Sequence, residues 1–571
     1  MSRSCQSGRC ARPRRVGAVA RADVEEETVS VTTLSRTAQG DRVPTATERA
    51  KPRARDLDPV ISWAATLGIT FIAAFLRLQD LSKPSSFLFD ETYYAKDAWS
   101  LVHKGYVSGY VEGADTKILA GDLHGLWTND PSMVVHPEVG KWLIGLGELI
   151  FGMDPSGWRF APAIVGSLMV FVMIRLARRV TGSTMLGLVA GLLMTFDGLQ
   201  LVLSRLALLD IFQAFFVLCA VSCLVADRDW FRARLARLAA DTNGTLSGWG
   251  PRVLWRPWLL ATGVWWGLAI GTKWSSIFPL AAFGILFWLW SSGARRSFGI
   301  RWAWVKSALI DAAPALLYVV VLPLIVYVVS WTGWLMHADV YEQHLSNTQY
   351  GPYWGSYIKT DAHGFFPELF QSLRSLWHYH HDVYTFHTHF LNDAHHVYQS
   401  NPLGWLVLNR PVGVDAQLDI AQGAQGCDAT GSETCLRQVI LLGTPALWWF
   451  ATIAFLWSAV CWIGKRDWRY GIVVVGVLVT WLPWLRYDDR PIFSYYAIVI
   501  EPFLILGAVL LLGEILGRAA PGTRRRRIGA IAAGAIVVTI AVNFAWFWPI
   551  YTDGLLTESE WMQRIWFSRW I

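Results

Sequence analysis

Long apolar stretches recur along most of this chain, and short polar connections separate them. A helix needs about 20 mainly apolar residues to cross the hydrocarbon layer of a membrane. About eleven stretches meet this criterion, and they predict an all-helical polytopic membrane protein. They begin near Val60, Trp158, Ser183, Leu206, Pro257, Ser275, Lys306, Thr444, Tyr470, Ser494 and Gly529.

Two segments depart from this pattern. Residues 1–57 are rich in Arg, Ser, Thr and Glu, a composition that is typical of a disordered tail. This segment lacks the short apolar core and cleavage site of a secretory signal peptide, so we expect the first span to remain as an anchor. The apolar segment Val139–Phe151 is too short to span, and we expect it to lie along the interface or to re-enter the membrane.

Clusters of basic residues follow every second predicted span. Because basic loops stay in the cytoplasm, this alternation places all of these clusters and the N-terminus on the cytoplasmic side of the cell membrane. Two large loops, residues 79–157 and 332–443, and the C-terminal segment 553–571 then fall on the extracytoplasmic side. The clusters are Arg175, Arg178 and Arg179; Arg228, Arg232, Arg234 and Arg237; Arg295, Arg296 and Arg301; Lys465, Arg466 and Arg469; and 524–527.

The composition agrees with a membrane protein. The chain has 571 residues, of which 53% are hydrophobic and 16% charged, and it contains 33 Trp. A soluble protein would carry about 25% charged residues, and Trp is enriched at membrane interfaces. The formal net charge of +7 is explained by the cytoplasmic loops. We do not expect nucleic-acid binding, because no basic and aromatic stripe lies outside the apolar segments.

The seven cysteines divide by their surroundings, and Cys5 and Cys10 lie in the polar N-terminal tail. Cys427 and Cys435 lie in the second large loop, and we expect a disulfide between them if that loop is extracytoplasmic; two free thiols are the alternative. Cys219, Cys223 and Cys461 lie in apolar stretches, where cysteine behaves as a small buried hydrophobe.

Acidic and basic residues from different parts of the chain gather at the predicted outer face. A carboxylate there could take a proton from a hydroxyl group, and Arg or Lys could hold a lipid phosphate. Each charge taken singly could instead reach to water at the interface. Asp210 lies deep enough that a partner is expected, and its role could be structural. The set is Asp90, Glu91, Asp97, His136, Lys141, Arg159, Arg205, Asp210, Lys273, Arg486, Asp488, Asp489 and Arg490.

The second large loop is rich in histidine. Its spacing matches no strong metal signature such as H-E-x-x-H, although a metal site is conceivable. We expect substrate contact or interfacial packing instead, and neither a metal nor a cofactor. The residues are His378, His380, His381, His387, His389, His395 and His396.

Five short motifs, taken in order, resemble the protein O-mannosyltransferases, which are polytopic glycosyltransferases of the GT-C architecture. The resemblance extends from about residue 60 to residue 550, and the segment 443–449 is similar to the bacterial members. The motifs are Asp90-Glu91, His136-Pro137-x-x-Gly140-Lys141, Arg159-Phe160-x-Pro162, Arg205-x-x-x-x-Asp210 and His396-x-Tyr398-x-Ser400-x-Pro402.

The resemblance implies a polyprenyl-phosphate-mannose donor and a Ser or Thr acceptor on a protein that is being translocated. It also implies inversion at the sugar carbon, with no nucleotide and no required metal. Asp90 would be the general base, and Glu91 would help to place the acceptor. Arg159 would contact the donor phosphate, assisted by Lys141 and His136. Lys273 could also meet a phosphate or a lipid headgroup, and the further site candidates are Arg205, Asp210, Arg490, His396 and Tyr398.

The sequence departs from the family in two places and leaves three alternatives open. The second loop has no room for the β-trefoil module of the eukaryotic members, and His136-Pro137-Glu138 replaces their His-Pro-Pro. One alternative is a related enzyme that moves an arabinose-type sugar onto a glycan or lipid. A second is a retaining reaction with Glu91 as nucleophile. The third is a sugar-lipid flippase or transporter with Glu501 on its path, although no internal repeat supports it.

Overall fold

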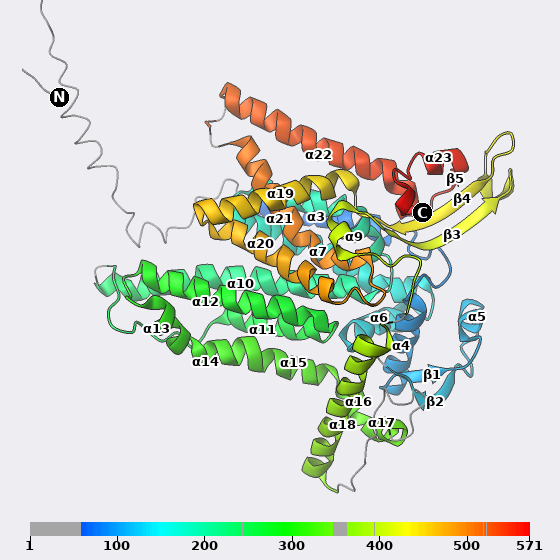
Figure 1. Ribbon diagram of the computed structural model, residues 1–571, viewed down its shortest axis with the longest axis horizontal. Coiled ribbons are helices and arrows are strands. Elements are labelled where there is room, and N and C mark those ends of the chain that lie inside the picture. The colour runs from blue at the N-terminus through cyan, green and yellow to red at the C-terminus, as the bar shows by residue number, and fades with distance from the viewer. Residues whose placement is uncertain are drawn as a thin grey trace, which may run out of the picture.

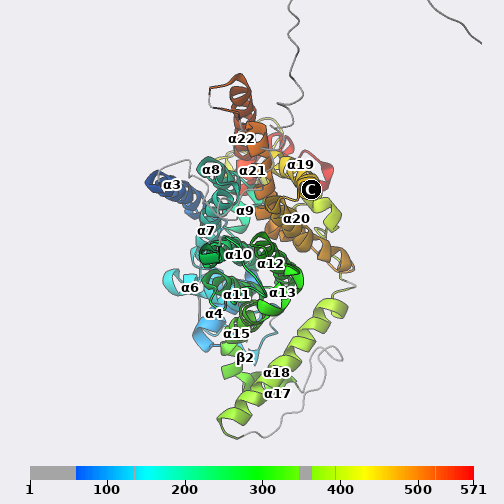
Figure 2. The same cartoon turned by 90° about the vertical axis from the view of Figure 1, so that its left-hand side faces the viewer.

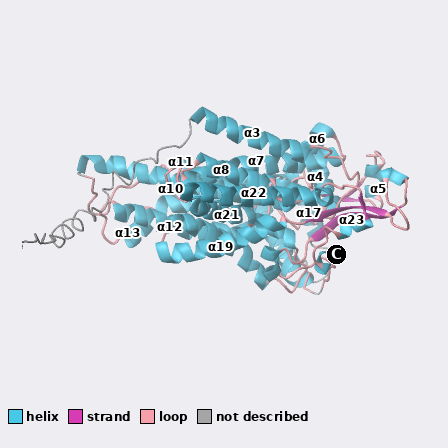
Figure 3. Cartoon of the chain, turned by 90° about the horizontal axis from the view of Figure 1, so that it is seen from above, coloured by secondary structure: helices cyan, strands magenta, loops and turns pink. Residues whose placement is uncertain are grey.

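The computed structural model describes residues 59–133, 135–242, 244–345, 363–392, 394–517, 519–520 and 522–571. The predicted disordered tail, with Cys5 and Cys10, therefore lies outside the described residues. Most of the described chain is a bundle of helices that run in a common direction, and the strands gather at one end of this bundle (Figures 1 and 3).

Eight helical segments of the described chain are long and apolar enough to cross a membrane. They confirm the predicted polytopic helical architecture. They comprise α3 (Pro59–Leu78), α7 (Pro155–Thr181), α10 (Leu209–Ala239), α12 (Ile277–Ser297) with the preceding turn, α14 (Ala312–Ala315) continued through a π-helical segment into α15 (Leu322–Ser330), α19 (Pro445–Lys465), α20 (Trp468–Trp481) continued to Arg486, and α22 (Arg524–Tyr551). A short helix, α13 (Ala303–Ile310), precedes α14.

The other three predicted spans coincide with helices that are shorter than expected. They are α8 (Thr184–Thr195), α11 (Pro257–Ile270) and α21 (Glu501–Leu516). Helix α8 ends early because the Asp197 side chain accepts a hydrogen bond from the Gln200 amide and starts a new helix, α9 (Gly198–Leu203). An Asp at this position satisfies one of the free amides of a helix N-terminus. The hydropathy pattern does not detect such an internal break.

The first large loop builds a small layer at one end of the bundle. It contains α4 (Glu91–Lys104), α5 (Ala114–Leu119) and a two-stranded antiparallel sheet of β1 (Ser108–Tyr110) and β2 (Trp127–Pro131). Helix α6 (Val139–Phe151) has the bounds of the predicted short apolar segment. It packs against both α4 and α7, and so joins this layer to the bundle.

The second large loop lies at the same end. It contains α16 (Thr332–Met336), α17 (Ala338–Leu345), α18 (Phe365–Thr385) and the hairpin of β3 (Val412–Ile420) and β4 (Cys435–Leu441). The C-terminal segment adds β5 (Leu556–Thr557), which pairs with β4, and α23 (Glu558–Met562). The second loop and the C-terminal segment therefore pack against each other at one end of the bundle.

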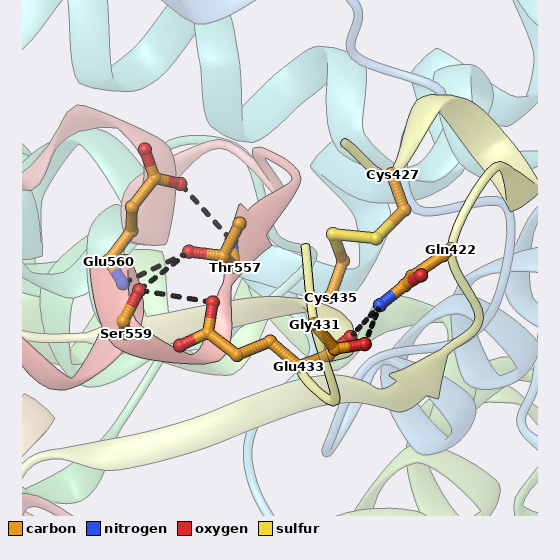
Figure 4. Close-up of a disulfide and its surroundings, with 8 residues drawn as sticks. All are labelled: Gln422, Cys427, Gly431, Glu433, Cys435, Thr557, Ser559 and Glu560. Carbon is orange, nitrogen blue, oxygen red and sulfur yellow. Dashed lines mark hydrogen bonds between the residues drawn. A yellow bond between two sulfur atoms is a disulfide. The ribbon is translucent and has the colours of Figure 1, made fainter. Parts of the chain in front are cut away.

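A disulfide joins Cys427 to Cys435 at the base of the hairpin tip (Figure 4). Next to it, the Gln422 amide donates hydrogen bonds to the carbonyl oxygens of Gly431 and Glu433, at 2.9 and 3.0 Å. The hydroxyl of Ser559, on α23, donates to the Glu433 carboxylate. The disulfide and the Gln422 bonds brace the hairpin, and the Ser559 bond joins it to the C-terminal segment.

Candidate active site

A cavity of about 670 Å³ lies between α12, α15 and α20. Most of its wall is apolar and includes Phe278, Leu280, Val320, Leu324 and Val479. One end is polar and is lined by His136, Gln213, Lys273, His387, Arg490 and Tyr496. A long apolar chain with an anionic group at one end would match this distribution.

The chain makes a strained turn immediately before Asp90. Phe89 has a φ of 52°, which a bulky side chain adopts only where the surroundings enforce it. Its ring is held edge-on by three aromatic rings, those of His396, Phe493 and Tyr495, at centroid distances of 5.8, 5.4 and 5.9 Å. The turn fixes where α4 begins and therefore where the Asp90 carboxylate lies.

Asp90 precedes α4, but its side chain does not cap the helix. None of the described residues donates a hydrogen bond to its carboxylate. Burial raises the pKa of Asp90 to about 6, against the effect of the Lys273 ammonium, which lowers it, while Asp210 raises it further. A carboxylate of this kind is ionised at neutral pH and has free acceptor atoms, as a general base requires.

Lys273 and Asp210 form a buried ion pair of 2.8 Å. Asp210 lies in the first turn of α10, where the helix dipole favours a negative charge, and Lys273 lies in the turn after α11. The ammonium also lies 4.9 Å from the ring centroid of Tyr496. Lys273 is thus the partner that the sequence predicts for Asp210, and the pair brings Lys273 to the polar end of the cavity.

His136, His387 and Arg490 complete this polar end. The two imidazole rings stack at a centroid distance of 5.3 Å, and Arg490 Nη1 lies 2.8 Å from His387 Nδ1. Burial and the nearby Lys273 hold the pKa of His136 well below its usual range, and burial with Arg490 lowers the pKa of His387 to about 4. The Arg490 Nε–H is buried and finds no partner among the described residues. Both histidines are therefore neutral at pH 7, and the fixed positive charges are Lys273 and Arg490.

Glu91 and Arg159 lie together but away from this cavity. Arg159 donates through Nε and Nη2 to the two carboxylate oxygens of Glu91, at 2.9 and 2.7 Å. Its remaining N–H groups bond the carbonyl oxygens of Leu81, Pro84 and Ser86. Because every N–H of this buried guanidinium is used inside the protein, the geometry does not favour the phosphate contact that the family resemblance implies.

Lys141 and Arg205 are also engaged elsewhere. The Lys141 ammonium is buried and lies 2.8 Å from an Asp97 carboxylate oxygen. Arg205 Nη1 and Nη2 donate to carbonyl oxygens at the end of α3, among them those of Arg77 and Asp80, at 3.2 and 3.0 Å. Arg205 thus caps the first span, a position where a cation is favoured.

The remaining candidates lie around Phe89 or inside the bundle. His396 contacts Phe89, and its Nδ1 accepts a hydrogen bond from the Tyr398 amide at 3.1 Å. The Tyr398 ring lies 5.4 Å from the guanidinium of Arg410. Glu501 is buried in the first turn of α21, where its carboxylate finds no hydrogen-bond partner among the described residues. Within the described part of the chain, no cluster of His, Cys, Asp and Glu is arranged to hold a metal ion.

Sequence reasoning did not name three residues of the polar end as site residues. His387 is one of seven histidines in the stretch 378–396 of the second large loop, and the sequence did not distinguish it from the others. Gln213 is a polar side chain within an apolar span, which is itself a signal of a site, and its amide bonds Ser275 and Ser276 beside Lys273. Tyr496 belongs to the aromatic segment 493–496, in which no sequence pattern indicated a site.

The fold and this cavity define a polytopic membrane glycosyltransferase of the GT-C architecture. The chain matches the dolichyl-phosphate-mannose–protein mannosyltransferase family over residues 68–341, and the C-terminal four-TMM region of protein O-mannosyltransferases over residues 372–570. It therefore belongs to the protein mannosyltransferase family, which confirms the resemblance drawn from the motifs.

Relatives and a solved structure agree with this assignment. A polyprenol-phosphate-mannose–protein mannosyltransferase of Mycolicibacterium smegmatis is 35% identical over 90% of this chain and 94% of its own length. The protein of the same name from Corynebacterium glutamicum is 31% identical over 89% of this chain and 93% of its own. The Saccharomyces cerevisiae Pmt1–Pmt2 complex bound to the sugar donor shares the fold, with a TM-score of 0.64 at 14% identity, covering 92% of this chain and 94% of the yeast chain.

Proposed function

We propose that this protein transfers mannose from polyprenyl-phosphate-mannose to Ser or Thr hydroxyls of proteins that are being exported. The reaction would take place at the extracytoplasmic face of the cell membrane, the side that carries the two large loops. The names of the bacterial relatives support the donor and the protein acceptor. The observation that carries the proposal is the contrast between two adjacent acids. Glu91 is fully paired, whereas the Asp90 carboxylate accepts no hydrogen bond from the described residues and lies near the charges of Lys273 and Asp210.

The cavity supplies a binding site for such a donor. The apolar wall formed by α12, α15 and α20 would hold the polyprenyl chain, and the polar end would hold the phosphate. Lys273 and Arg490 are the cations placed to contact it, and the neutral His136 can donate a hydrogen bond. The Nε2–H of His387 donates to the Val135 carbonyl and its Nδ1 accepts from Arg490, so His387 orients Arg490. This assigns the phosphate to Lys273, Arg490 and His136, while Arg159 and Lys141 hold the first loop in place.

The chemistry is one displacement at the sugar carbon. The Asp90 carboxylate accepts the proton of the acceptor hydroxyl as its oxygen bonds to the mannose C1. The bond from C1 to the phosphate oxygen breaks, and the polyprenyl phosphate leaves with the electron pair, stabilised by Lys273 and Arg490. Because attack and departure occur on opposite faces, the sugar carbon inverts. Glu91 is not available as a nucleophile, since both of its oxygens are held by Arg159 and by the amides of Leu88 and Ala207.

Asp90→Asn tests the assigned base. Purified variant in proteoliposomes should transfer mannose to a Ser/Thr-rich peptide about 10²- to 10⁴-fold more slowly, while its affinity for polyprenyl-phosphate-mannose stays within a few-fold of the parent. The matched control is Asp115→Asn, which removes a nearby half-exposed carboxylate that pairs with Lys96. Full transfer by Asp90→Asn would exclude Asp90 as the base.

The sugar and the acceptor are tested by comparing two donors. Radiolabelled lipid-linked mannose and lipid-linked arabinose are offered separately to membranes that contain the protein. Label from mannose that enters protein supports the proposal. Label that enters glycolipid and not protein would favour the arabinose-type alternative.

A further inference from the structure

Helix α18 presents a row of large apolar side chains to its surroundings. Phe366, Phe370 and Trp377 are 78%, 73% and 78% exposed, and Leu373 and Tyr384 extend the same row. Their spacing of three, four and seven residues places them on one face of a helix. A row of exposed large apolar side chains is a mark of an interaction site.

The opposite face of α18 fixes its orientation. Leu376, Tyr379 and Val383 are buried and pack in a cluster with Trp331 and Trp334. The ring centroids of Trp334 and Tyr379 are 5.6 Å apart. The exposed row therefore cannot rotate into the protein without dismantling this cluster.

The position of α18 indicates what covers its exposed face. In Figure 1 the helix lies across the direction of the spanning helices, at the end where the two large loops gather. In the view along the spans, much of α18 lies beside α12 and α15 rather than behind them (Figure 2). A bilayer around the bundle would thus extend beneath this helix.

The exposed row also reaches the cavity that the spans line. Tyr384, at the C-terminal end of the row, lines the same cavity as Leu324 of α15 and Phe278 of α12. Leu324 and Phe278 are themselves exposed on membrane-spanning helices. Exposed apolar side chains of the spans and of α18 therefore border the same cavity.

We propose that α18 is an in-plane membrane helix whose aromatic face, formed by Phe366, Phe370, Leu373, Trp377 and Tyr384, lies in the boundary between headgroups and acyl chains. Helices of this kind bury their apolar face about 5–10 Å into that boundary. The occupant of the surface is the lipid bilayer. The C-terminal end of α18 then forms a rim of the cavity, through which a lipid donor enters sideways from the leaflet; this second role rests on the proposed function.

Spin-label accessibility tests the proposal without using enzymatic activity. Nitroxides are attached at Phe370→Cys and Trp377→Cys in the full chain, reconstituted in liposomes of phosphatidylethanolamine and phosphatidylglycerol. Ile325→Cys, on the membrane-facing side of α15, is the lipid control, and Leu418→Cys, on β3, is the aqueous control; both native side chains are exposed. The disulfide is kept, and the other cysteines are replaced by Ala: Cys5, Cys10, Cys219, Cys223 and Cys461.

Labels at 370 and 377 should collide readily with oxygen and rarely with a water-soluble nickel chelate, as the label at 325 does. If they instead collide with the nickel chelate as the label at 418 does, the face is open to water and the proposal fails. Protection from both reagents would mean that a protein covers the face, which also overturns it. Tyr384→Cys is the second variant if either label prevents folding.

A functional arm separates the rim role from the membrane contact. Phe370→Ser combined with Trp377→Ser should raise the KM for a long-chain polyprenyl-phosphate-mannose in liposomes several-fold. The same variant should keep the parent's KM for a short-chain donor in detergent. An equal effect on both donors would overturn the rim role but leave the accessibility result intact. Absence of transfer by the parent protein would count against the proposed function alone.

Discussion

Glu91 and Arg159 are joined by two parallel hydrogen bonds, and neither side chain is exposed to solvent. The pair binds the first large loop to α7, since Arg159 also holds the carbonyl oxygens of the loop segment 81–86. Asp90, the neighbour of Glu91, has no such partner among the described residues. One member of the acidic pair therefore holds the backbone in place, and the carboxylate of the other keeps its acceptor atoms available within this part of the structure.

Removing either partner of this pair should unfold the first loop. Arg159→Ala and Glu91→Ala each leave a buried charge uncompensated, which costs about 3–5 kcal/mol in the free energy of unfolding. Thermal unfolding of the purified variants in detergent should show this loss as a marked fall in melting temperature. Lys96→Ala is the control, because it breaks the more exposed pair with Asp115 and should cost about 1 kcal/mol or less. A stable Arg159→Ala protein that fails to bind donor would instead show that Arg159 contacts the phosphate.

The pH dependence of transfer should report the ionisation of Asp90. Because its pKa is raised to about 6 and the base must be ionised, kcat/KM should rise with pH through about 6 and then level off. The ammonium of Lys273 stabilises the ionised form, so Lys273→Met should move this rise to higher pH. Asp210 destabilises it, so Asp210→Asn should move the rise to lower pH.

These opposite shifts distinguish an electrostatic effect from general damage to the site. Both variants break the same ion pair and should lower activity, but a merely structural role would leave the midpoint of the pH profile unchanged. The profile of Asp115→Asn serves as the control. Shifts in the same direction for both variants would contradict the assignment of the midpoint to Asp90.

The sequence predicted the scaffold better than the partners within it. The length of each apolar stretch indicated the membrane helices, because a helix must be about 20 residues long to span a bilayer. The break at Asp197 was not indicated, because it depends on contacts with Thr444 and Trp448 from a distant helix. Asp90 was singled out from its position after the first span, and its role as the base stays a prediction. The family motif assigned Arg159 to the phosphate. Its bonds to the segment 81–86 arise only in the folded protein, so no local sequence pattern could show that its N–H groups are already used.

Arg205 should be necessary for a stable first span. It satisfies carbonyl oxygens at the end of α3 from a distant part of the chain, and an unsatisfied buried polar group costs about 1–3 kcal/mol. Arg205→Ala should lower the melting temperature clearly, and Arg205→Lys should lower it less, because an ammonium can reach only part of this set. Arg564→Ala, at an exposed guanidinium that bonds the Trp546 carbonyl, is the control. Unchanged stability of Arg205→Ala with loss of donor binding would return Arg205 to the active site.

The orientation of the chain can be tested by cysteine accessibility in intact cells. The positive-inside rule places the loop after α10 in the cytoplasm and the β3–β4 hairpin outside. A membrane-impermeant maleimide should therefore label Leu418→Cys in intact cells and should label Ser247→Cys only after permeabilisation. Both native side chains are exposed, so steric protection does not explain a difference. The disulfide pair Cys427 and Cys435 should react only after reduction, and then without permeabilisation. Labelling of residue 247 in intact cells would invert the orientation and place Asp90 on the cytoplasmic face, where acceptors would be proteins that have not crossed the membrane.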